Sequence, residues 1–88
     1  MFRVDWLQSA LDQLAAAWVD ADAELRQAIT IAANQLEHDL RSSPIELGES
    51  RNPGERIYFV PPLAVAYDVD SGTRVVTILS VRVFRRPR

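Results

Sequence analysis

Arginine is the residue type in this sequence with the clearest capacity for chemistry. All ten basic residues are arginines and none is lysine. A guanidinium group is a planar fork of N–H donors, which holds a phosphate or a carboxylate through two hydrogen bonds. Residues 51–88 contain seven arginines and three acids, a net charge of +4, whereas residues 1–50 carry −6. The C-terminal half therefore indicates an anionic partner, although charges that protect a solvated sheet edge would give the same pattern.

The candidate site residues lie on or beside predicted strands. Arg56 and Tyr58 are two positions apart, so strand alternation places their side chains on one face. Arg82 shares a face with Phe84 on the last predicted strand. If one face of the sheet is left open by the helices, we expect these groups to converge there into a concave basic site.

Three further arginines are expected to bind an anion beside that site. Arg85 and Arg86 follow the last predicted strand, and Arg51 precedes the first. Arg51 has an alternative role, because it could pair with the neighbouring acids Glu49 or Glu55 instead.

The first predicted helix is built from apolar residues at steps of four, three and four. These residues are Leu7, Leu11, Leu14 and Trp18. Asp5 followed by Gln8 resembles a capping box that opens the helix. Trp18 is expected to be a core residue, whereas Trp6 is a candidate for an exposed contact with a partner.

A second helix is expected to begin at Asp20 or Asp22 and to end before Pro44. Its apolar stripe consists of Leu25, Ile29, Leu36 and Leu40, with Ala32 and Ala33 between them. The short link predicts that the two helices lie antiparallel. His38 stands on a polar side of this helix with no metal-ligand spacing around it, which favours a solvated histidine.

After a predicted loop over residues 44–55, the spacing of apolar residues changes from the helical period to the alternation that is typical of strands. Strands are predicted over residues 57–60, 63–69 and 74–84, with Tyr67 among core residues, and residues 2–4 could add a short edge strand. Asp70 to Thr73 forms the predicted hairpin turn, with Gly72 able to take a positive φ.

These elements predict an α+β fold in one domain, residues 1–88. An N-terminal antiparallel helical hairpin is expected to cover one face of a three- to four-stranded antiparallel β-sheet. The absence of cysteine excludes disulfides and thiolate metal sites. No run approaches about 20 apolar residues, and the N-terminus does not read as a signal peptide, so we expect a cytoplasmic protein without a membrane contact.

Four segments, taken in order, resemble a known family. They are the helical hairpin "AAAWVDADAELRQAITIAANQLEHDL", the loop "SPIELGESRNPGERIYF", the strand "PPLAVAYDVD" and the terminal strand "RVVTILSVRVFRR" with its basic end. Their order and spacing are similar to the RelE/ParE toxin superfamily, whose members are also described as plasmid-stabilisation proteins. The resemblance covers nearly the whole chain.

The resemblance implies the toxin of a bacterial type II toxin–antitoxin system, without metal or cofactor. Cleaving members act as mRNA interferases on the ribosome, whereas gyrase-poisoning members share the fold but lack that chemistry. A cognate antitoxin, encoded beside the toxin, is expected to lay an amphipathic helix or a strand over the hairpin or a sheet edge.

The cleaving mode, that of a metal-independent and ribosome-dependent mRNA endoribonuclease, is the expected one, and its expected catalytic residues are Arg56, Tyr58 and Arg82. The arginines would stabilise the negatively charged phosphorane, and Tyr58 would stack or transfer a proton. Two parts of the family pattern are missing, because Ala64 replaces a basic residue and no aromatic residue follows Phe84. Gyrase poisoning and a non-catalytic protein that only binds an antitoxin therefore stay open as alternatives.

Overall fold

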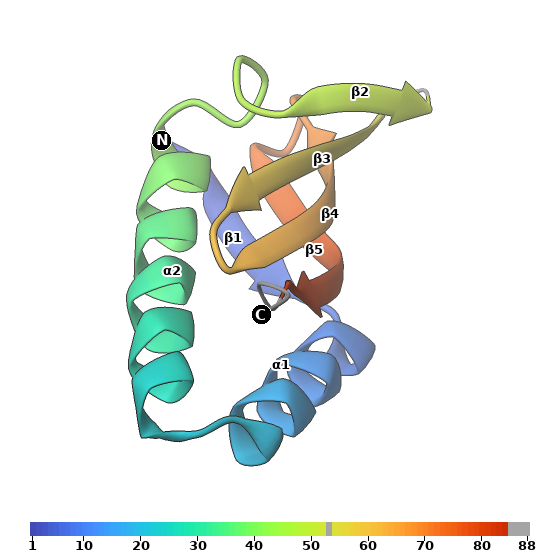
Figure 1. Ribbon diagram of the computed structural model, residues 1–88. Coiled ribbons are helices and arrows are strands. Elements are labelled where there is room, and N and C mark those ends of the chain that lie inside the picture. The colour runs from blue at the N-terminus through green and yellow to red at the C-terminus, as the bar shows by residue number, and fades with distance from the viewer. Residues whose placement is uncertain (53, 85–88) are drawn as a thin grey trace.

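The computed structural model describes residues 1–52 and 54–84, with the backbone alone at positions 51 and 52. Two helices and five strands follow one another along the chain (Figure 1). They are β1 (Arg3–Trp6), α1 (Gln8–Asp20), α2 (Ala23–Ser42), β2 (Glu49–Asn52), β3 (Glu55–Val60), β4 (Leu63–Asp70) and β5 (Val75–Val83).

The strands form one mixed sheet in the order β1-β5-β4-β3-β2. The meander β2-β3-β4-β5 is antiparallel, and β1 joins its far edge parallel to β5. The predicted α+β fold is confirmed, but the sheet has five strands. Residues 49–52 were expected in a loop and instead pair with β3, whereas β1 extends to Trp6 because its backbone follows β5 from Val75 to Ile78.

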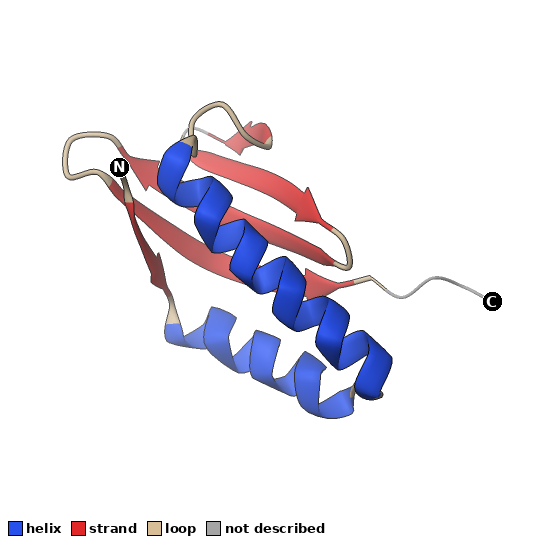
Figure 2. Ribbon diagram, turned by 90° about the vertical axis from the view of Figure 1, so that its left-hand side faces the viewer, coloured by secondary structure: helices blue, strands red, loops and turns tan. Residues whose placement is uncertain are grey.

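Both helices lie on the same face of the sheet (Figure 2). Helix α2 begins as the sequence predicts, since the Asp22 carboxylate accepts a hydrogen bond of 2.8 Å from the Leu25 N–H. Its buried stripe packs on the sheet and consists of Ile29, Ala32, Leu36 and Leu40. The core is completed by strand residues, of which the largest is the fully buried Tyr67, as predicted.

Helix α1 differs from its prediction in its cap and in its buried face. Asp5 lies in β1, so the helix starts after Leu7 without a side-chain cap. Its one buried residue is Ala10, whereas Leu11 and Trp18 are each 41% exposed. The placement of Trp18 in the core was therefore wrong. The physical reason is that both side chains line a groove between the two helices, which diverge from their short link (Figure 2), instead of packing into the core.

The turn between β4 and β5 is stabilised by Asp70, whose side chain accepts from the N–H groups of Gly72 and Thr73 at 2.9 and 3.1 Å. Arg74, not Gly72, takes the positive φ, at 59°. The expected role of Gly72 was therefore wrong, because the left-handed residue stands at the end of the turn.

No helix in the described ranges is long and apolar enough to cross a membrane.

Candidate functional site

Arg56 is held by the loop that follows α2. Its Nε donates to the Leu47 carbonyl oxygen at 2.8 Å and a terminal nitrogen donates to the Gly48 carbonyl oxygen at 3.0 Å. The Tyr67 hydroxyl lies 2.8 Å from the Pro44 carbonyl oxygen and 2.7 Å from that of Leu47, and its one proton is shared between these two acceptors. Arg56 and Tyr67 thus fasten the loop to the helix-facing side of β3 and β4, where they stand directly opposite each other.

Gly48 is required by this arrangement. Its φ is +70°, and a Cβ at this position would collide with the Ile57 carbonyl group and lie 3.2 Å from the Tyr67 hydroxyl oxygen. Only glycine combines that backbone conformation with so close an approach. The loop therefore presents its carbonyl oxygens to Arg56 because position 48 has no side chain.

Tyr58 also points toward the helical layer. Its hydroxyl donates to an Asp39 carboxylate oxygen at 2.9 Å, which connects β3 to α2. Burial raises the pKa of Tyr58 above 10.0, and the hydrogen bond to the negatively charged Asp39 raises it further. Tyr58 is thus held as a neutral phenol whose proton is engaged with a carboxylate.

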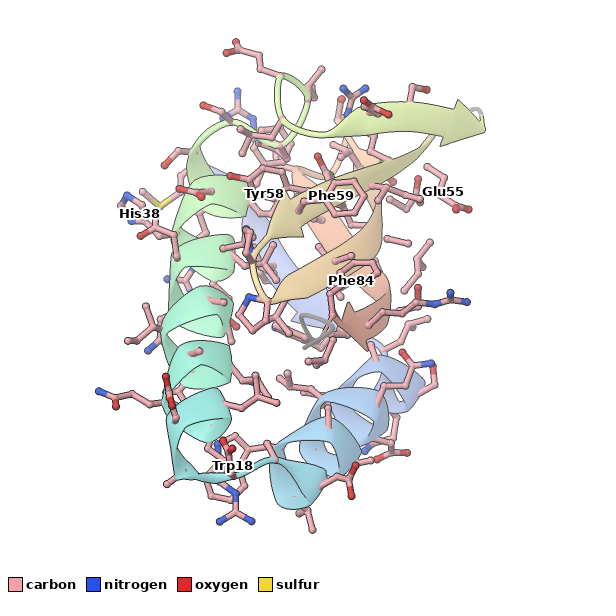
Figure 3. The ribbon with its side chains drawn as sticks, viewed as in Figure 1. Trp18, His38, Glu55, Tyr58, Phe59 and Phe84 are labelled. Atoms are coloured by element: carbon pink, nitrogen blue, oxygen red, sulfur yellow. The ribbon has the colours of Figure 1, made fainter. Side chains whose placement is uncertain are left out.

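Arg82 lies on the other face of the sheet. It is exposed and stands opposite Ala64, which stands opposite Phe59 on β3. The rings of Phe59 and Phe84 are 6.1 Å apart, and the two side chains are 52% and 55% exposed (Figure 3). We call Phe59, Ala64, Arg82 and Phe84 the aromatic patch.

The predicted convergence of the arginines was wrong for the residues that the structure places. Arg56 and Tyr58 do share a face, as alternation predicted, but that face is the one covered by the helices. Arg82 is on the open face, so the sheet separates it from Arg56. The side chain of Arg51 lies outside the described residues, as do Arg85 and Arg86, and their predicted roles in anion binding stay predictions.

Carboxylates line the open face beyond the aromatic patch. Glu55 on β3 stands directly opposite Asp68 on β4, and the row continues through Thr77 on β5 to Asp5 on β1. Asp5 forms an ion pair of 2.8 Å with Arg3. No side chain that the structure describes forms an ion pair with Glu55 or Asp68. We call Glu55, Asp68 and Asp5 the carboxylate row.

A groove of about 640 Å³ opens between the diverging helices. Its apolar lining consists of Leu11, Leu14, Ala15, Trp18, Val19, Ile29 and Ala33. Polar side chains, among them Asp12 and Asn34, also line it. We call this feature the helix groove. Its size and lining suit an apolar ligand or a row of apolar side chains from a partner protein.

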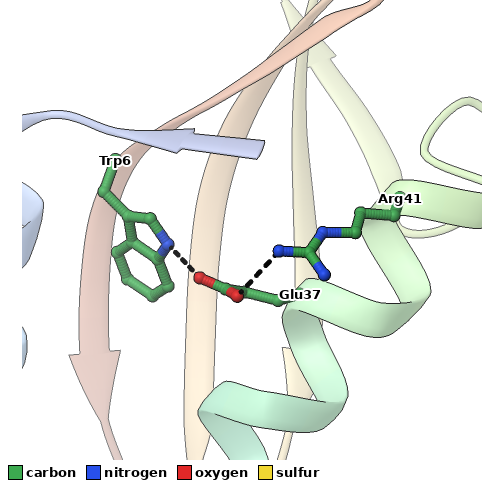
Figure 4. A network of polar contacts seen from close by, with 3 residues as sticks. All are labelled: Trp6, Glu37 and Arg41. Atoms are coloured by element: carbon green, nitrogen blue, oxygen red, sulfur yellow. Dashed lines mark hydrogen bonds and ion pairs between the residues drawn. The ribbon is translucent and has the colours of Figure 1, made fainter. Parts of the chain in front are cut away.

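Trp6 forms a contact within the fold. Its interpretation as an exposed residue that contacts a partner was therefore wrong. Its indole Nε1 donates to Glu37 of α2 at 2.8 Å, and Glu37 also pairs with Arg41 at 3.4 Å (Figure 4). The contact ties the edge strand β1 to α2. His38 is exposed, as expected, and points away from the sheet (Figure 3).

Within the described ranges no group of three or more histidine, aspartate or glutamate side chains is placed to hold a metal ion. The helix groove and the carboxylate row were not predicted from the sequence. The groove depends on how far the helices diverge, which periodicity does not encode. The row depends on strand register, and the facing of Glu55 and Asp68 could have been found by pairing the two strands across Pro61 and Pro62.

Comparison with known proteins gives a match at the level of structure alone. No family model matches the sequence, and no curated protein sequence does either. A chain of the chromosomal ParDE toxin–antitoxin system from P. aeruginosa superposes with a TM-score of 0.76 at 17% identity, covering 97% of this chain and 98% of that one.

Two further solved structures agree with that match. A chain of the RelBE2 toxin–antitoxin complex from Mycobacterium tuberculosis gives a TM-score of 0.71 at 16% identity, covering 94% of this chain and 91% of that one. The isolated E. coli RelE toxin gives 0.64 at 20% identity, covering 99% and 88%. This chain therefore has the fold of the RelE/ParE toxins, as its sequence pattern predicted.

Proposed function

We propose that this chain is the toxin of a type II toxin–antitoxin pair and that an antitoxin holds it inactive in the cytoplasm. The observation that carries the proposal is the helix groove, an exposed apolar channel on a fold shared with RelE and ParE toxins. The solved neighbours include toxin–antitoxin complexes. An exposed apolar groove of this kind is typical of a surface that a partner covers.

The antitoxin segment that suits the groove is an amphipathic helix. Leu11, Trp18 and Val19 are exposed along α1 and offer contacts to apolar residues spaced three and four apart. Docking there would leave the open face of the sheet uncovered, so the groove and the open face would serve different partners.

A growth assay with matched variants tests the proposal. Induction of the chain alone should arrest growth, and co-expression of the small protein encoded beside it should relieve the arrest. Leu11→Glu places a charge in the groove and should lower the affinity for that protein at least tenfold. Ile31→Glu is the matched control, because Ile31 is 61% exposed on α2 but does not line the groove. Harmless induction, or equal loss in both variants, would refute the proposal.

For the mode of action, the contacts favour binding to a protein target over cleavage of mRNA. Cleavage requires a basic residue and a proton-transfer group at one phosphate. Arg56 is engaged by two carbonyl oxygens and Tyr58 by Asp39, both on the covered face, whereas Arg82 is on the other. DNA gyrase is the protein target that the family resemblance implies, and inhibition of supercoiling by the purified chain would support it.

mRNA cleavage is the second candidate, and the aromatic patch is the observation in its favour. Arg82 could hold a phosphate while Phe59 or Phe84 stacks on a base. In that mode the transcripts of arrested cells should be cut within codons, and Arg82→Ala should relieve the arrest. Intact transcripts together with inhibited gyrase would decide for the protein target.

A further inference from the structure

The open face of the sheet has the properties of a protein-docking surface. Phe59 and Phe84 expose about half of their side chains there, with Ala64 beside Phe59 as a small neighbour. Ile57 and Ala66 continue this apolar surface as a cross-strand pair and are only partly buried. Exposed aromatic side chains next to a small, flat apolar surface are typical of the centre of an interface.

The charges on the same face select the kind of partner. Glu55 and Asp68 are directly opposite on neighbouring antiparallel strands, where like charges repel. A cationic group placed between them would remove that repulsion. Arg82 in the aromatic patch could meet one phosphate of a nucleic acid, but a strand that extended along the face would bring further phosphates onto Glu55 and Asp68, which adds to the repulsion.

The spacing along β3 gives the geometry of the partner. Phe59 stands four positions after Glu55, and a strand rises about 3.4 Å per residue, so the aromatic patch and the carboxylate row are about 14 Å apart along β3. Both side chains are on the same face, because their separation is even. An extended segment of a partner matches this spacing when its basic side chain is four positions from the apolar side chain that contacts the aromatic patch.

We infer that the open face docks a protein segment that places an apolar side chain on Phe59 and Phe84 and a lysine or arginine on Glu55 and Asp68. The surface is on the opposite side of the sheet from the helix groove, so an antitoxin helix in the groove does not occupy it. That this segment belongs to the target of the toxin rests on the proposed function; the docking itself does not.

Site-specific photocross-linking in growing cells tests the docking. The full chain carries p-benzoylphenylalanine in place of Phe59, and a second chain carries it in place of Ile31 on α2 as the background. The charge-reversed variant is Glu55→Lys/Asp68→Lys, which keeps a like-charge pair in the sheet and so disturbs the fold little. The matched control is Glu24→Lys/Glu46→Lys, which makes the same change of net charge at exposed positions outside the sheet.

The expected result is a cross-link from position 59 to a protein segment in which a lysine or arginine stands close to an apolar residue. The yield should fall at least tenfold in Glu55→Lys/Asp68→Lys and stay within twofold in the control. If the charge-reversed chain fails to fold, Glu55→Gln/Asp68→Asn replaces it and should lower the yield at least threefold.

Three results would overturn the inference: a cross-link to RNA, a yield that the charge changes do not alter, or no cross-link above that of position 31. Growth arrest is not measured in this experiment, so the cross-linking result does not depend on whether the chain is toxic. A harmless chain that cross-links as described would refute the proposed toxin and leave the docking surface intact.

Discussion

The guanidinium group of Arg26 lies 4.6 Å from the centre of the Trp18 ring, and its nitrogens donate to the carbonyl oxygens of Trp18 and Val19 at 2.8 and 2.9 Å. A side chain from the first turns of α2 thereby binds the last carbonyls of α1, where the helix dipole favours a cation. The same contact covers one face of the Trp18 ring. Arg26 therefore connects the start of α2 to the end of α1, beside Trp18, which lines the helix groove.

Arg26→Ala should lower the free energy of unfolding by about 1–2 kcal/mol, because two charge-assisted hydrogen bonds and a cation–π contact are lost. Urea denaturation at neutral pH measures this. In a Trp6→Phe background, the Trp18 emission should also shift to the red as the ring loses its cover.

Arg41→Ala is the control for that measurement. Arg41 also lies on α2, but its ion pair with Glu37 is 3.4 Å long and its side chain is 52% exposed. Exposed pairs contribute about 0–1 kcal/mol, so the loss should be smaller than for Arg26→Ala. Equal losses in the two variants would show that Arg26 does not hold the helices.

Arg56→Ala and Arg82→Ala should separate structural from functional arginines. Loss of Arg56 removes the donor to two loop carbonyl groups and should cost about 1.5–3 kcal/mol of unfolding free energy. Arg82 is exposed and forms no ion pair with a described residue, so its loss should change stability by less than about 0.5 kcal/mol. Thermal unfolding of both proteins measures the difference, and a stability loss at Arg82 as large as at Arg56 would contradict it.

The parts of the fold that were predicted from the sequence depend on local patterns. The stripe of α2 and its Asp22 cap follow from helical spacing and capping chemistry, and the buried side of β4 follows from alternation around Tyr67. These patterns show which side of a helix or strand is buried, and that side can be predicted from the sequence of the one element alone.

The parts that were missed depend on how elements meet. Alternation placed Arg56 and Tyr58 together correctly, but it does not say which face the helices cover. The exposure of Trp18 depends on how the two helices pack against each other, and the position of Asp5 depends on backbone pairing with β5, far along the chain. Such long-range pairings have no local signal in the sequence. The candidate site was predicted less accurately than the single helices and strands, because its residues come from several elements.

Glu55→Lys should stabilise the fold. It turns the repulsive pair with Asp68 into an attractive one, which is worth about 0.5 kcal/mol and raises the melting temperature by about 2–4 °C. The control is Glu46→Lys, an exposed loop position that has no opposite acid across a strand. Scanning calorimetry at low ionic strength should show the gain at position 55 alone, and equal melting temperatures for the two variants would argue against the repulsion.

Alkaline pH should unfold the chain through its two tyrosines. Burial raises the pKa of Tyr58 and of Tyr67 above 10.0 in the folded state; the hydrogen bond to Asp39 adds to this at Tyr58, and the nearby Arg56 opposes it at Tyr67. A raised pKa means that the unfolded chain loses these protons first. The stabilisation is therefore complete below pH 10 and is lost as the pH rises through the folded-state values.

The chain contains neither lysine nor cysteine, so tyrosine is the side chain that titrates between about pH 9.5 and 11.5. Urea denaturation across this range should show an unfolding free energy that falls with pH. The slope should be smaller in Tyr58→Phe, which keeps Tyr67 as its one titrating phenol. An equal slope in Tyr58→Phe and the unaltered chain would show that the Asp39 hydrogen bond and the burial of Tyr58 do not couple its proton to folding.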